Sequence, residues 1–464
     1  MKNYIVNINN IPFTLKLQNG DHICAENILR VMPKQRLVIA GTCNDQPIVA
    51  KIFLNKNKGA RHLQNEMRGI TLLQKHNIPT PELYYLGQCA DNRYHLIIFK
   101  HIQHATTLEE IWRNKTSLDG VTPTLFAIMR ELATQHAYGI LQHDLHLKNF
   151  LIREQIIYTL DGAQIGRMPT PLSKKQSLHA IGLFLSQLGV GIEYYQAMLY
   201  QHYAQLRGFL TKQKDFHQLF SQISMHNHSR WLQYQKKIFR TATDFLPIKQ
   251  RSYQGMVDRH ALSPALSGWL KDPESAFSNP SCLMLKKGRS STVIKITFDR
   301  CDYVIKRYNI KNIFHYLRRA LRETRASHTW RLSQKLKLCY IPVATPIAYI
   351  EKHFFGLRST SYYVSAYLPE TCNQAYCKAH PERITQMLSS LAACNITHDD
   401  LKMSNILINQ QALPVLIDFD GAQEHTSQQH LQRDLKRSIK RFLKNFEPHS
   451  ELFQIFENQF KRWF

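Results

Sequence analysis

The sequence predicts an α+β protein made of two tandem domains of the same design. One reason is an eight-residue motif that occurs twice, as Gln-His-Asp-Leu-His-Leu-Lys-Asn at 142–149 and as His-Asp-Asp-Leu-Lys-Met-Ser-Asn at 398–405. The other reason is the order of segments ahead of each motif. Short β-like runs come first, a helical pattern follows, and a break containing Pro ends it, as Asn77-Ile-Pro-Thr-Pro or Ile341-Pro-Val-Ala-Thr-Pro. A shared motif order of this kind indicates an internal duplication.

Hydrophobic periodicity places the individual elements along the chain. In the first half it predicts a helix over 62–75 and strands at 4–8, 13–17, 36–40, 48–53 and 94–99. In the second half it predicts two strands within 283–298, a third at 303–306 and a helix over 313–336. Residues 247–280 carry Pro, Ser and Gly without sustained periodicity. We therefore expect a first domain at 1–246, a connecting segment at 247–280 and a second domain at 281–464.

Inside each motif, an Asp stands five positions before an Asn. This spacing is typical of a kinase catalytic loop, in which the Asp orients the acceptor hydroxyl and takes its proton while the Asn holds a magnesium ion on the phosphates. Asp144 and Asp400 are therefore candidate catalytic residues, and Asn149 and Asn405 are candidate metal ligands. We predict two tandem protein-kinase-like domains, each with a small β-rich N-lobe and a mostly helical C-lobe.

A kinase also needs a lysine for the phosphates of ATP. Lys51 and Lys306 each end a short apolar strand ahead of the catalytic motif, where that lysine is expected. A Glu on the next helix normally holds the lysine in place. Glu66 is the candidate in the first half and Glu323 in the second. Glu323 lies 19 positions before Pro342, whereas Glu66 lies 13 before Pro79. Glu323 is therefore either the partner of Lys306 or a surface carboxylate among arginines.

A second carboxylate follows each motif, where a kinase places its main metal ligand. The candidates are Asp161 in Leu-Asp-Gly and Asp418 in Asp-Phe-Asp-Gly, with Asp420 as a possible further carboxylate near the metals. If the halves are aligned on their shared Gly-Ala-Gln, Asp161 matches Asp420, and Thr159 falls opposite Asp418. Either a shorter loop brings Asp161 to the metal, or the first domain lacks its main ligand.

The loop that covers the phosphates has only a weak signal in both halves. In Lys286-Lys-Gly-Arg-Ser-Ser-Thr, Gly288 and Ser290 are the candidate phosphate-binding residues. The first half offers only Gly41-Thr-Cys. Neither is the glycine-rich pattern of a protein kinase, so neither identifies a kinase alone.

Composition limits the class of protein and its compartment. The 464 residues are 44% hydrophobic and 11% aromatic, which favours packed domains over disorder. The nine cysteines include no CxxC pair, so neither a disulfide framework nor a zinc site is expected. We find no apolar run of about 20 residues, as a transmembrane helix needs, and no signal peptide. We therefore expect a cytoplasmic protein.

The formal net charge of +26 predicts attraction to polyanions, namely nucleic acid, an anionic membrane surface or a phosphorylated substrate. Ten Lys or Arg lie between Lys306 and Lys337, against Glu323 alone. Residues 435–446 form an amphipathic basic helix, which either packs its apolar face on its own domain or lies on a membrane. No aromatic and basic RNA-binding motif is present, so nucleic acid is not an expected partner.

The motifs of the second half resemble those of the bacterial lipopolysaccharide core kinases, which phosphorylate heptose or 3-deoxy-D-manno-octulosonic acid (Kdo) and have a protein-kinase-like fold. The resemblance lies in Lys306-Arg-Tyr-Asn-Ile-Lys-Asn, Ile341-Pro-Val-Ala-Thr-Pro, His398-Asp-Asp-Leu-Lys-Met-Ser-Asn and Leu416-Ile-Asp-Phe-Asp-Gly-Ala-Gln. It spans nearly all of 283–445 and, more weakly, 36–165. It implies ATP and Mg²⁺ as cofactors, a sugar hydroxyl of the lipopolysaccharide core as acceptor, and work at the inner face of the inner membrane.

Two other readings stay open at this point. A protein Ser/Thr kinase is one, although neither metal turn leads into an Ala-Pro-Glu-like motif. The other is a pseudokinase-type binding module in one or both halves, which the irregular metal turn favours for the first. The second half has the more complete set of catalytic residues.

Overall fold

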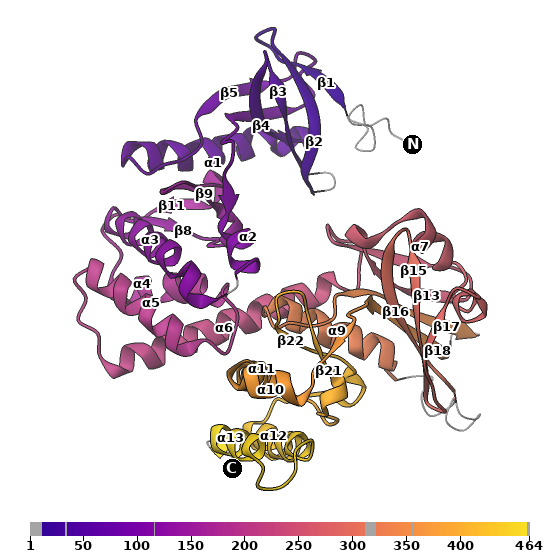
Figure 1. Ribbon diagram of the computed structural model, residues 1–464. Helices are drawn as coiled ribbons and strands as arrows, with labels where there is room; N and C mark the ends of the chain where they lie inside the picture. Colours follow the sequence, from indigo (N-terminus) through magenta and orange to yellow (C-terminus); the bar gives the residue numbers. More distant parts are fainter. Residues whose placement is uncertain (1–11, 33–34, 116, 311–321, 355–356, 462–464) are drawn as a thin grey trace. The chain divides into compact units, whose positions relative to one another are not determined.

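The computed structural model describes residues 12–32, 35–115, 117–310, 322–354 and 357–461. These residues form two compact units, and each unit mixes helices with sheets (Figure 1). Unit 1 comprises the described parts of Met1–Gln187 and Tyr194–His226, and unit 2 those of Leu188–Glu193 and Asn227–Phe464. The boundary falls inside helix α6 (Gln213–Lys237) and not at residue 246. A boundary within one continuous helix leaves no Pro- or Gly-rich linker for a sequence pattern to reveal.

Unit 1 begins with an antiparallel sheet of six strands among its described residues, in the order β1-β2-β3-β4-β6-β5. The strands are β1 (Phe13–Lys16), β2 (His22–Met32), β3 (Arg36–Cys43), β4 (Gln46–Phe53), β5 (Leu83–Gln88) and β6 (His95–Lys100). Helix α1 (Lys56–Lys75) connects β4 to β5 and starts at Asn55, whose side chain accepts from two N–H groups of the first turn. Buried residues alternate along β3 and form a core on one face of the sheet.

The rest of unit 1 is largely helical. Its helices are α2 (Leu108–Arg113), α3 (Leu118–Ala137), α4 (Lys174–Ser186), α5 (Glu193–Leu206) and the first part of α6. Its short strands are β7 (Thr106–Thr107), β8 (Ile140–Gln142), β9 (Phe150–Arg153), β10 (Ile156–Thr159) and β11 (Ile165–Arg167). β8 pairs with β11, and β9 lies between β7 and β10. These short strands hold the 142–149 motif and the turn that follows it.

The large sheet of unit 2 has seven strands among the described residues, in the order β12-β13-β17-β18-β16-β15-β14. They are β12 (Phe245–Lys249), β13 (Tyr253–Asp258), β14 (Leu283–Lys287), β15 (Ser291–Phe298), β16 (Cys301–Tyr308), β17 (Pro346–Phe354) and β18 (Leu357–Ala366). Helix α9 (Arg325–Leu338) packs on β17 and β18, and α7 (Pro264–Trp269) contributes Trp269 to the core of the sheet.

The expected connecting segment 247–280 is therefore wrong. It supplies most of β12, all of β13 and the helix α7, and Val257 and Leu266 are buried in the core of unit 2. β13 pairs with β17, so that Tyr253 lies opposite Lys352. Strands that pair across about 100 residues of chain leave no pairing pattern in the local sequence. The Pro, Ser and Gly residues around these short strands were therefore mistaken for a linker.

The two units repeat the same strand arrangement. The order β2-β3-β4-β6-β5 in unit 1 matches β14-β15-β16-β18-β17 in unit 2, with α1 and α9 at the same place in the connection. Unit 2 also repeats the short strands, as β19 (Glu370–Thr371), β20 (Ile396–Thr397), β21 (Ile406–Ile408), β22 (Pro414–Leu416) and β23 (Gln423–Glu424). β20 pairs with β23, and β21 lies between β19 and β22, as in unit 1.

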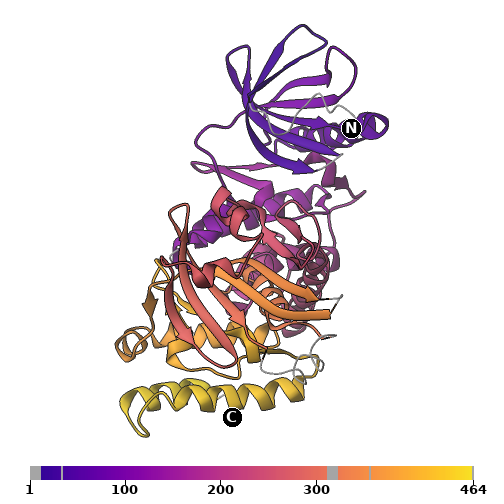
Figure 2. The same ribbon diagram turned by 90° about the vertical axis from the view of Figure 1, so that its right-hand side faces the viewer.

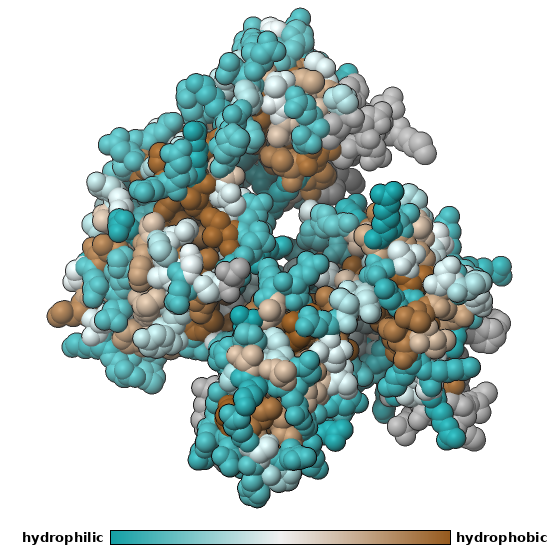
Figure 3. Space-filling model, in the orientation of Figure 1, coloured by the Kyte–Doolittle hydropathy of each residue, from teal (hydrophilic) through white to brown (hydrophobic). Residues whose placement is uncertain are grey.

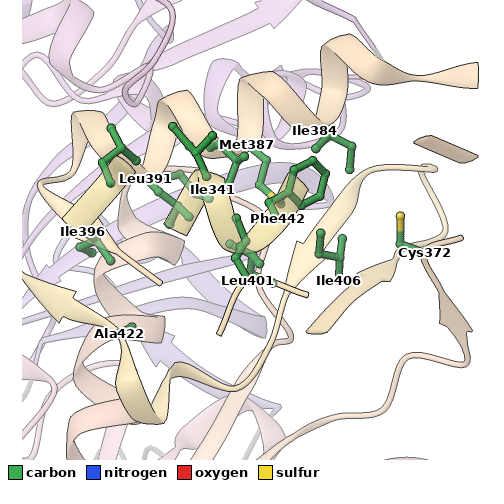
Figure 4. Packing of buried hydrophobic residues seen from close by; sticks show 14 of the residues in the cluster. Ile341, Cys372, Ile384, Met387, Leu391, Ile396, Leu401, Ile406, Ala422 and Phe442 are labelled. Carbon is green, nitrogen blue, oxygen red and sulfur yellow. The ribbon is translucent and has the colours of Figure 1, made fainter. Parts of the chain in front are cut away.

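The C-terminal helices of unit 2 enclose a second core. They are α10 (Gln374–Ala379), α11 (Pro381–Ala393), α12 (Gln428–Leu443) and α13 (Glu451–Phe460), and Figures 1 and 2 show α12 and α13 in yellow. Figure 4 shows Phe442 of α12 among Met387, Ile384 and Leu401 in this core. The apolar face of α12 thus packs on its own unit, as the first alternative for residues 435–446 states, while Lys440 and Arg441 stay exposed. Within the described residues, every helix is too short or too polar to cross a bilayer.

Most predicted elements of the described chain are present, with shifted ends. The helix expected over 62–75 starts six residues earlier, and the long strand β2 had not been predicted. The strand expected at 4–8 lies outside the described residues, as does 313–321 of the helix expected over 313–336. The remainder of that helix is α9, which begins at Arg325 because Thr324 caps it through the N–H of Ser327.

We predict that Phe442→Ala lowers the free energy of unfolding by about 3–5 kcal/mol, because the lost ring leaves a cavity in a closed core. The ring is fully buried, and its centroid lies 5.1 Å from that of Phe456 and 5.3 Å from that of Phe446. Denaturant unfolding followed by circular dichroism measures the change. Tyr194→Ala is the control, because Tyr194 is 88% exposed and should change stability by no more than about 0.5 kcal/mol. Equal effects of the two substitutions would contradict this packing.

Candidate active site

In unit 2, the strand lysine meets the carboxylates of the turn. Lys306 on β16 places its Nζ 2.7 Å from Asp418 Oδ1 and 2.7 Å from Asp420 Oδ2. Tyr308 stands two positions further along the strand and so faces the same side. Its hydroxyl donates to the other oxygen of Asp420 at 2.6 Å. Burial and the Asp420 carboxylate raise the pKa of Tyr308 well above its usual range, so the hydroxyl keeps its proton and acts as the donor.

Asp418 occupies a strained position at the start of this turn. Its backbone is left-handed, with φ 65° and ψ 60°, and a 3₁₀ turn follows at Phe419–Gly421. Burial acts to raise the pKa of Asp418, but the Lys306 ammonium outweighs it and holds the pKa below its usual range. Buried Phe419 meets the edge of the His398 ring, and His398 Nε2 donates to the carbonyl of Ile417 at 3.0 Å. The motif histidine therefore supports the backbone of the turn.

The candidate base Asp400 is held by the motif and by α12. Asn405 Nδ2 donates to the Asp400 carbonyl at 2.8 Å, which closes the loop. Lys402 Nζ lies 2.7 Å from one carboxylate oxygen of Asp400, and Arg441 Nη2 lies 3.2 Å from the other. Burial raises the pKa of Asp400, but the hydrogen bonds and charges of these two cations lower it below its usual range. The carboxylate is therefore ionised near neutral pH and able to accept a proton or a hydrogen bond.

A cavity of about 530 Å³ lies beside Lys306, Asn405 and Asp418. Leu285, Val293 and Val304 of the sheet form an apolar part of its wall, and Lys306, Asn405 and Asp418 line a polar part. Its volume lies within the usual range for a small-ligand site, and an apolar wall beside convergent charges suits a ligand with a flat base and an anionic tail.

Gly288 and Ser290 lie in the turn between β14 and β15. Asn309 stabilises this turn through two hydrogen bonds. Its side chain donates to the Gly288 carbonyl at 3.0 Å, and its backbone N–H donates to the Ser290 carbonyl at 3.1 Å. In unit 1, Gly41-Thr-Cys lies inside strand β3 and is not a loop, which corrects that expectation. A Cβ on Gly41 would lie 1.9 Å from the Cys24 carbonyl oxygen, so this glycine serves strand packing.

The residues present suit a magnesium ion bound to phosphates. Asp418 and Asn405 both line the cavity, and hard oxygen ligands are those that Mg²⁺ prefers. Asn405 uses its Nδ2 for Asp400, which leaves the amide oxygen for a cation. Within the described residues, no three His, Cys, Asp or Glu side chains gather into a metal site of their own. Mg²⁺ commonly binds through one or two protein ligands together with substrate phosphates, so the pair is adequate.

Unit 1 brings the corresponding predicted residues together. Lys51 Nζ forms an ion pair with Glu66 Oε1 of α1, as predicted, and lies 3.5 Å from Asp161 Oδ1. Glu66 is 1% exposed and also accepts from the N–H of Gly162 at 3.2 Å. Asn149 Nδ2 donates to the Asp144 carbonyl at 2.8 Å, the same contact as in unit 2.

The turn after each motif has the same backbone register in both units. Leu160 donates its N–H to the Asn149 carbonyl (2.8 Å), just as Ile417 does to that of Asn405 (3.0 Å). The next residue is Asp161 in one unit and Asp418 in the other, and both are left-handed, with φ of 63° and 65°. Asp161 therefore matches Asp418, and unit 1 reaches this position with a loop one residue shorter, 12 positions from Asn149 to Asp161 against 13 from Asn405 to Asp418. The alignment on the shared Gly-Ala-Gln was wrong by two residues, and Thr159 lies buried in β10.

Glu323 does not reach Lys306. It precedes α9 and pairs with Arg331, 3.3 Å from its Nε, which supports the alternative of a carboxylate among arginines. The physical reason is its place in the chain, since it lies before the first turn of the helix and not on the face that packs toward the lysine. Sequence reasoning also missed Tyr308, for which strand alternation was a signal, and Arg441, for which no local signal existed.

We predict that Gly69→Ala destabilises unit 1 by about 1–3 kcal/mol through overpacking, although Ala is intrinsically the better helix former. A Cβ on Gly69 would lie 2.0 Å from the Gly162 carbonyl oxygen, so α1 would have to move away from the turn. Denaturant unfolding measures the change. Gly268→Ala in α7 is the matched control, because its Cβ would meet nothing within 4 Å, and it should be neutral or stabilising. Stabilisation by both substitutions would refute the close packing of α1 on Gly162.

Comparison with known proteins bears on unit 2. Residues 286–460 match the model of the Lipopolysaccharide kinase (Kdo/WaaP) family, a match that covers less than half of the chain. None of the curated proteins matches this sequence. The matched range contains Lys306, the 398–405 motif and the turn at Asp418. In this part, the chain is similar to a family of kinases that act on lipopolysaccharide.

Proposed function

We propose that this protein transfers the γ-phosphoryl group of ATP to a sugar hydroxyl, heptose or Kdo, of the lipopolysaccharide inner core. The observation that carries the proposal is one cavity lined by Lys306, Asp418 and Asn405, with Asp400 held beside it through Asn405, inside the range that is similar to lipopolysaccharide kinases. A sugar kinase needs a phosphate anchor, metal ligands and a base, and these four side chains supply those three functions.

Each side chain has a distinct task in this proposal. The apolar wall formed by Leu285, Val293 and Val304 receives the adenine base. Lys306 neutralises charge on the phosphates, and Gly288 and Ser290 lie in the turn that covers them. Asp418 and Asn405 would hold Mg²⁺, which offsets the charge that develops on the transferred phosphoryl group. Asp400 accepts a hydrogen bond from the acceptor hydroxyl, aims its oxygen at the γ-phosphorus and takes its proton.

We propose the same kinase-like design for unit 1, so that the chain carries two such domains in tandem. The matching strand order, the Asn149–Asp144 contact and the matching register of Asp161 support this proposal. Asp144 would be its base, Lys51 with Glu66 its phosphate anchor, and Asn149 and Asp161 its metal ligands. Whether unit 1 also turns over substrate is decided by the substitutions described next.

We predict that Asp400→Asn removes one phosphate from the lipopolysaccharide core of cells that depend on this protein. Loss of a general base typically lowers the rate by about 10²–10⁴-fold. Mass spectrometry of the core from cells carrying wild type, Asp400→Asn or Asp144→Asn identifies which unit acts. Asp399→Asn is the matched control, because Asp399 is the exposed neighbour of the base and bonds only to Gln423 among the described contacts. An unchanged core in both motif variants would exclude this acceptor.

We also propose that unit 2 works at an anionic membrane surface, the inner face of the inner membrane, through the basic side of α12. Lys440, Arg441 and Lys444 are exposed on this helix, opposite its buried apolar face. In Figure 3, hydrophilic residues line the lower edge of the molecule, over α12 and α13. Since Arg441 also contacts Asp400, this surface leads directly to the candidate base. A lipid-borne acceptor would thus approach the site from a bound membrane.

We predict that Lys440→Gln with Lys444→Gln weakens binding to vesicles of phosphatidylcholine and phosphatidylglycerol. Each cation contributes about 1 kcal/mol near an anionic surface, so the two together correspond to a loss of more than tenfold. Vesicle flotation measures binding, which should also fall as salt is raised. The control is Lys249→Gln with Lys271→Gln, because both lysines are exposed in unit 2 and the charge change is identical. Equal losses for the two double variants would mean that the net charge, and not α12, drives binding.

A further inference from the structure

The carboxylate that orients the phosphate-anchoring lysine has different origins in the two units. We infer that Asp420 is the positioning residue for Lys306 in unit 2, where it replaces the helix glutamate that serves Lys51 in unit 1. The inference rests on the proposed phosphoryl transfer. The sequence had suggested Asp420 as a further carboxylate near the metals. The inference assigns Asp420 to Lys306 instead.

The first step is to match the two helices residue by residue. Beyond each helix, an N–H bonds back to a leucine carbonyl at 3.0 Å, from Ile78 to Leu73 and from Ile341 to Leu336. The residues just before these isoleucines both have positive φ, 54° at Asn77 and 58° at Tyr340. Leu73 therefore matches Leu336. Seven residues before these leucines stand Glu66 in α1 and Thr329 in α9.

The second step is to match the two turns. Asp161 corresponds to Asp418 by register and by its left-handed backbone. Two residues further on stand Ala163 in unit 1 and Asp420 in unit 2. Unit 1 therefore has a carboxylate on the helix and a methyl group in the turn. Unit 2 has a hydroxyl on the helix and a carboxylate in the turn.

The third step is the contact network around the relocated carboxylate. Asp420 uses one oxygen for Lys306, at 2.7 Å, and the other for the Tyr308 hydroxyl, at 2.6 Å. The Tyr308 hydroxyl also lies 3.4 Å from Thr329 Oγ1. Tyr308 therefore links the helix position that Glu66 occupies in unit 1 to the turn position that Asp420 occupies in unit 2. In unit 1, the residue two positions after the lysine is Phe53, which has no hydroxyl. The tyrosine thus accompanies the relocated carboxylate.

The relocation has a mechanical consequence. In unit 1, the orientation of the lysine depends on α1, because Glu66 belongs to that helix. In unit 2, the lysine is oriented by the same turn that carries Asp418, only two residues away. If Asp418 were to hold a metal ion, Asp420, which Tyr308 supports through a hydrogen bond, would still pair with the Lys306 ammonium. A shift of α9 would then leave the phosphate anchor in place.

The test moves the carboxylate back to the helix. We compare the full-length protein with Asp420→Ala, Thr329→Glu and the double variant, and measure kcat, KM for ATP and the Mg²⁺ concentration for half-maximal rate. Asp420→Ala should lower kcat/KM by about 100-fold, the size of effect expected when a catalytic group is misplaced. The double variant should regain at least tenfold of that loss. Tyr308→Phe should cause a smaller loss, because Asp420 keeps its contact with Lys306.

The possible results separate the inference from the function on which it rests. No rescue by Thr329→Glu, together with a raised Mg²⁺ requirement in Asp420→Ala, would overturn the inference and make Asp420 a metal ligand. Asp420→Asn, which keeps the size of the side chain, replaces Asp420→Ala if thermal unfolding shows that the latter fails to fold. A wild-type protein that transfers no phosphate and gains no thermal stability from Mg²⁺-ATP would instead reject the proposed kinase activity.

Discussion

The pairing of a strand lysine with carboxylates of the neighbouring turn is the interaction on which both sites depend. The side chains of Lys51 and Lys306 are only 15% and 13% exposed, and an ammonium group removed from water is costly unless it is paired. The pairing brings strands β4 and β16 into contact with residues more than 100 positions later in the chain. It therefore joins the large sheet of each unit to the turn that follows the eight-residue motif.

The turn tolerates different side chains because its shape is imposed by backbone contacts. Short strands on both sides fix its register, and the N–H before each Asp bonds to the carbonyl of the motif Asn. Gly162 in unit 1 and Phe419 in unit 2 occupy the same position of the turn, directly after the left-handed Asp, but the packing around them differs. The glycine lets α1 approach so closely that Glu66 accepts from the N–H of Gly162, whereas the phenylalanine fills the space and contacts His398. In unit 2, a carboxylate of the turn itself, Asp420, reaches the lysine.

The charges around Asp400 connect the catalytic motif with the surface of unit 2. Lys402 comes from the motif itself, while Arg441 comes from α12, on which Arg433, Arg437 and Lys440 are exposed as well. The apolar side of the same helix is buried in the C-terminal core. One amphipathic helix therefore both stabilises this unit and sets the electrostatic environment of the candidate base. This arrangement explains how a strongly basic chain keeps the Asp400 carboxylate ionised at this position.

Features encoded over short stretches were predictable from sequence. The Asp and Asn of each motif are five residues apart, and in both units the Asn side chain donates to the backbone carbonyl of the Asp. Lys51 and Glu66 were paired correctly because strand and helix follow each other directly. The segment 247–280 was misassigned and the two turns were misaligned, because strand pairing across distant residues decides both. For Glu323 the sequence left two alternatives open for a related reason, since only the packed helix reveals which face carries which residue.

By itself, the sequence determined the recurring eight-residue motif, many of the strands and helices ahead of each copy, and the residue types at each candidate site. These properties follow from spacing along the covalent chain and from local hydrophobic periodicity. The tertiary structure alone decided which carboxylate serves Lys306, which Asp begins the turn in unit 1, and that Arg441 reaches Asp400. Those outcomes depend on strand register and helix packing between segments far apart in the chain, where a shift of one or two residues changes every partner.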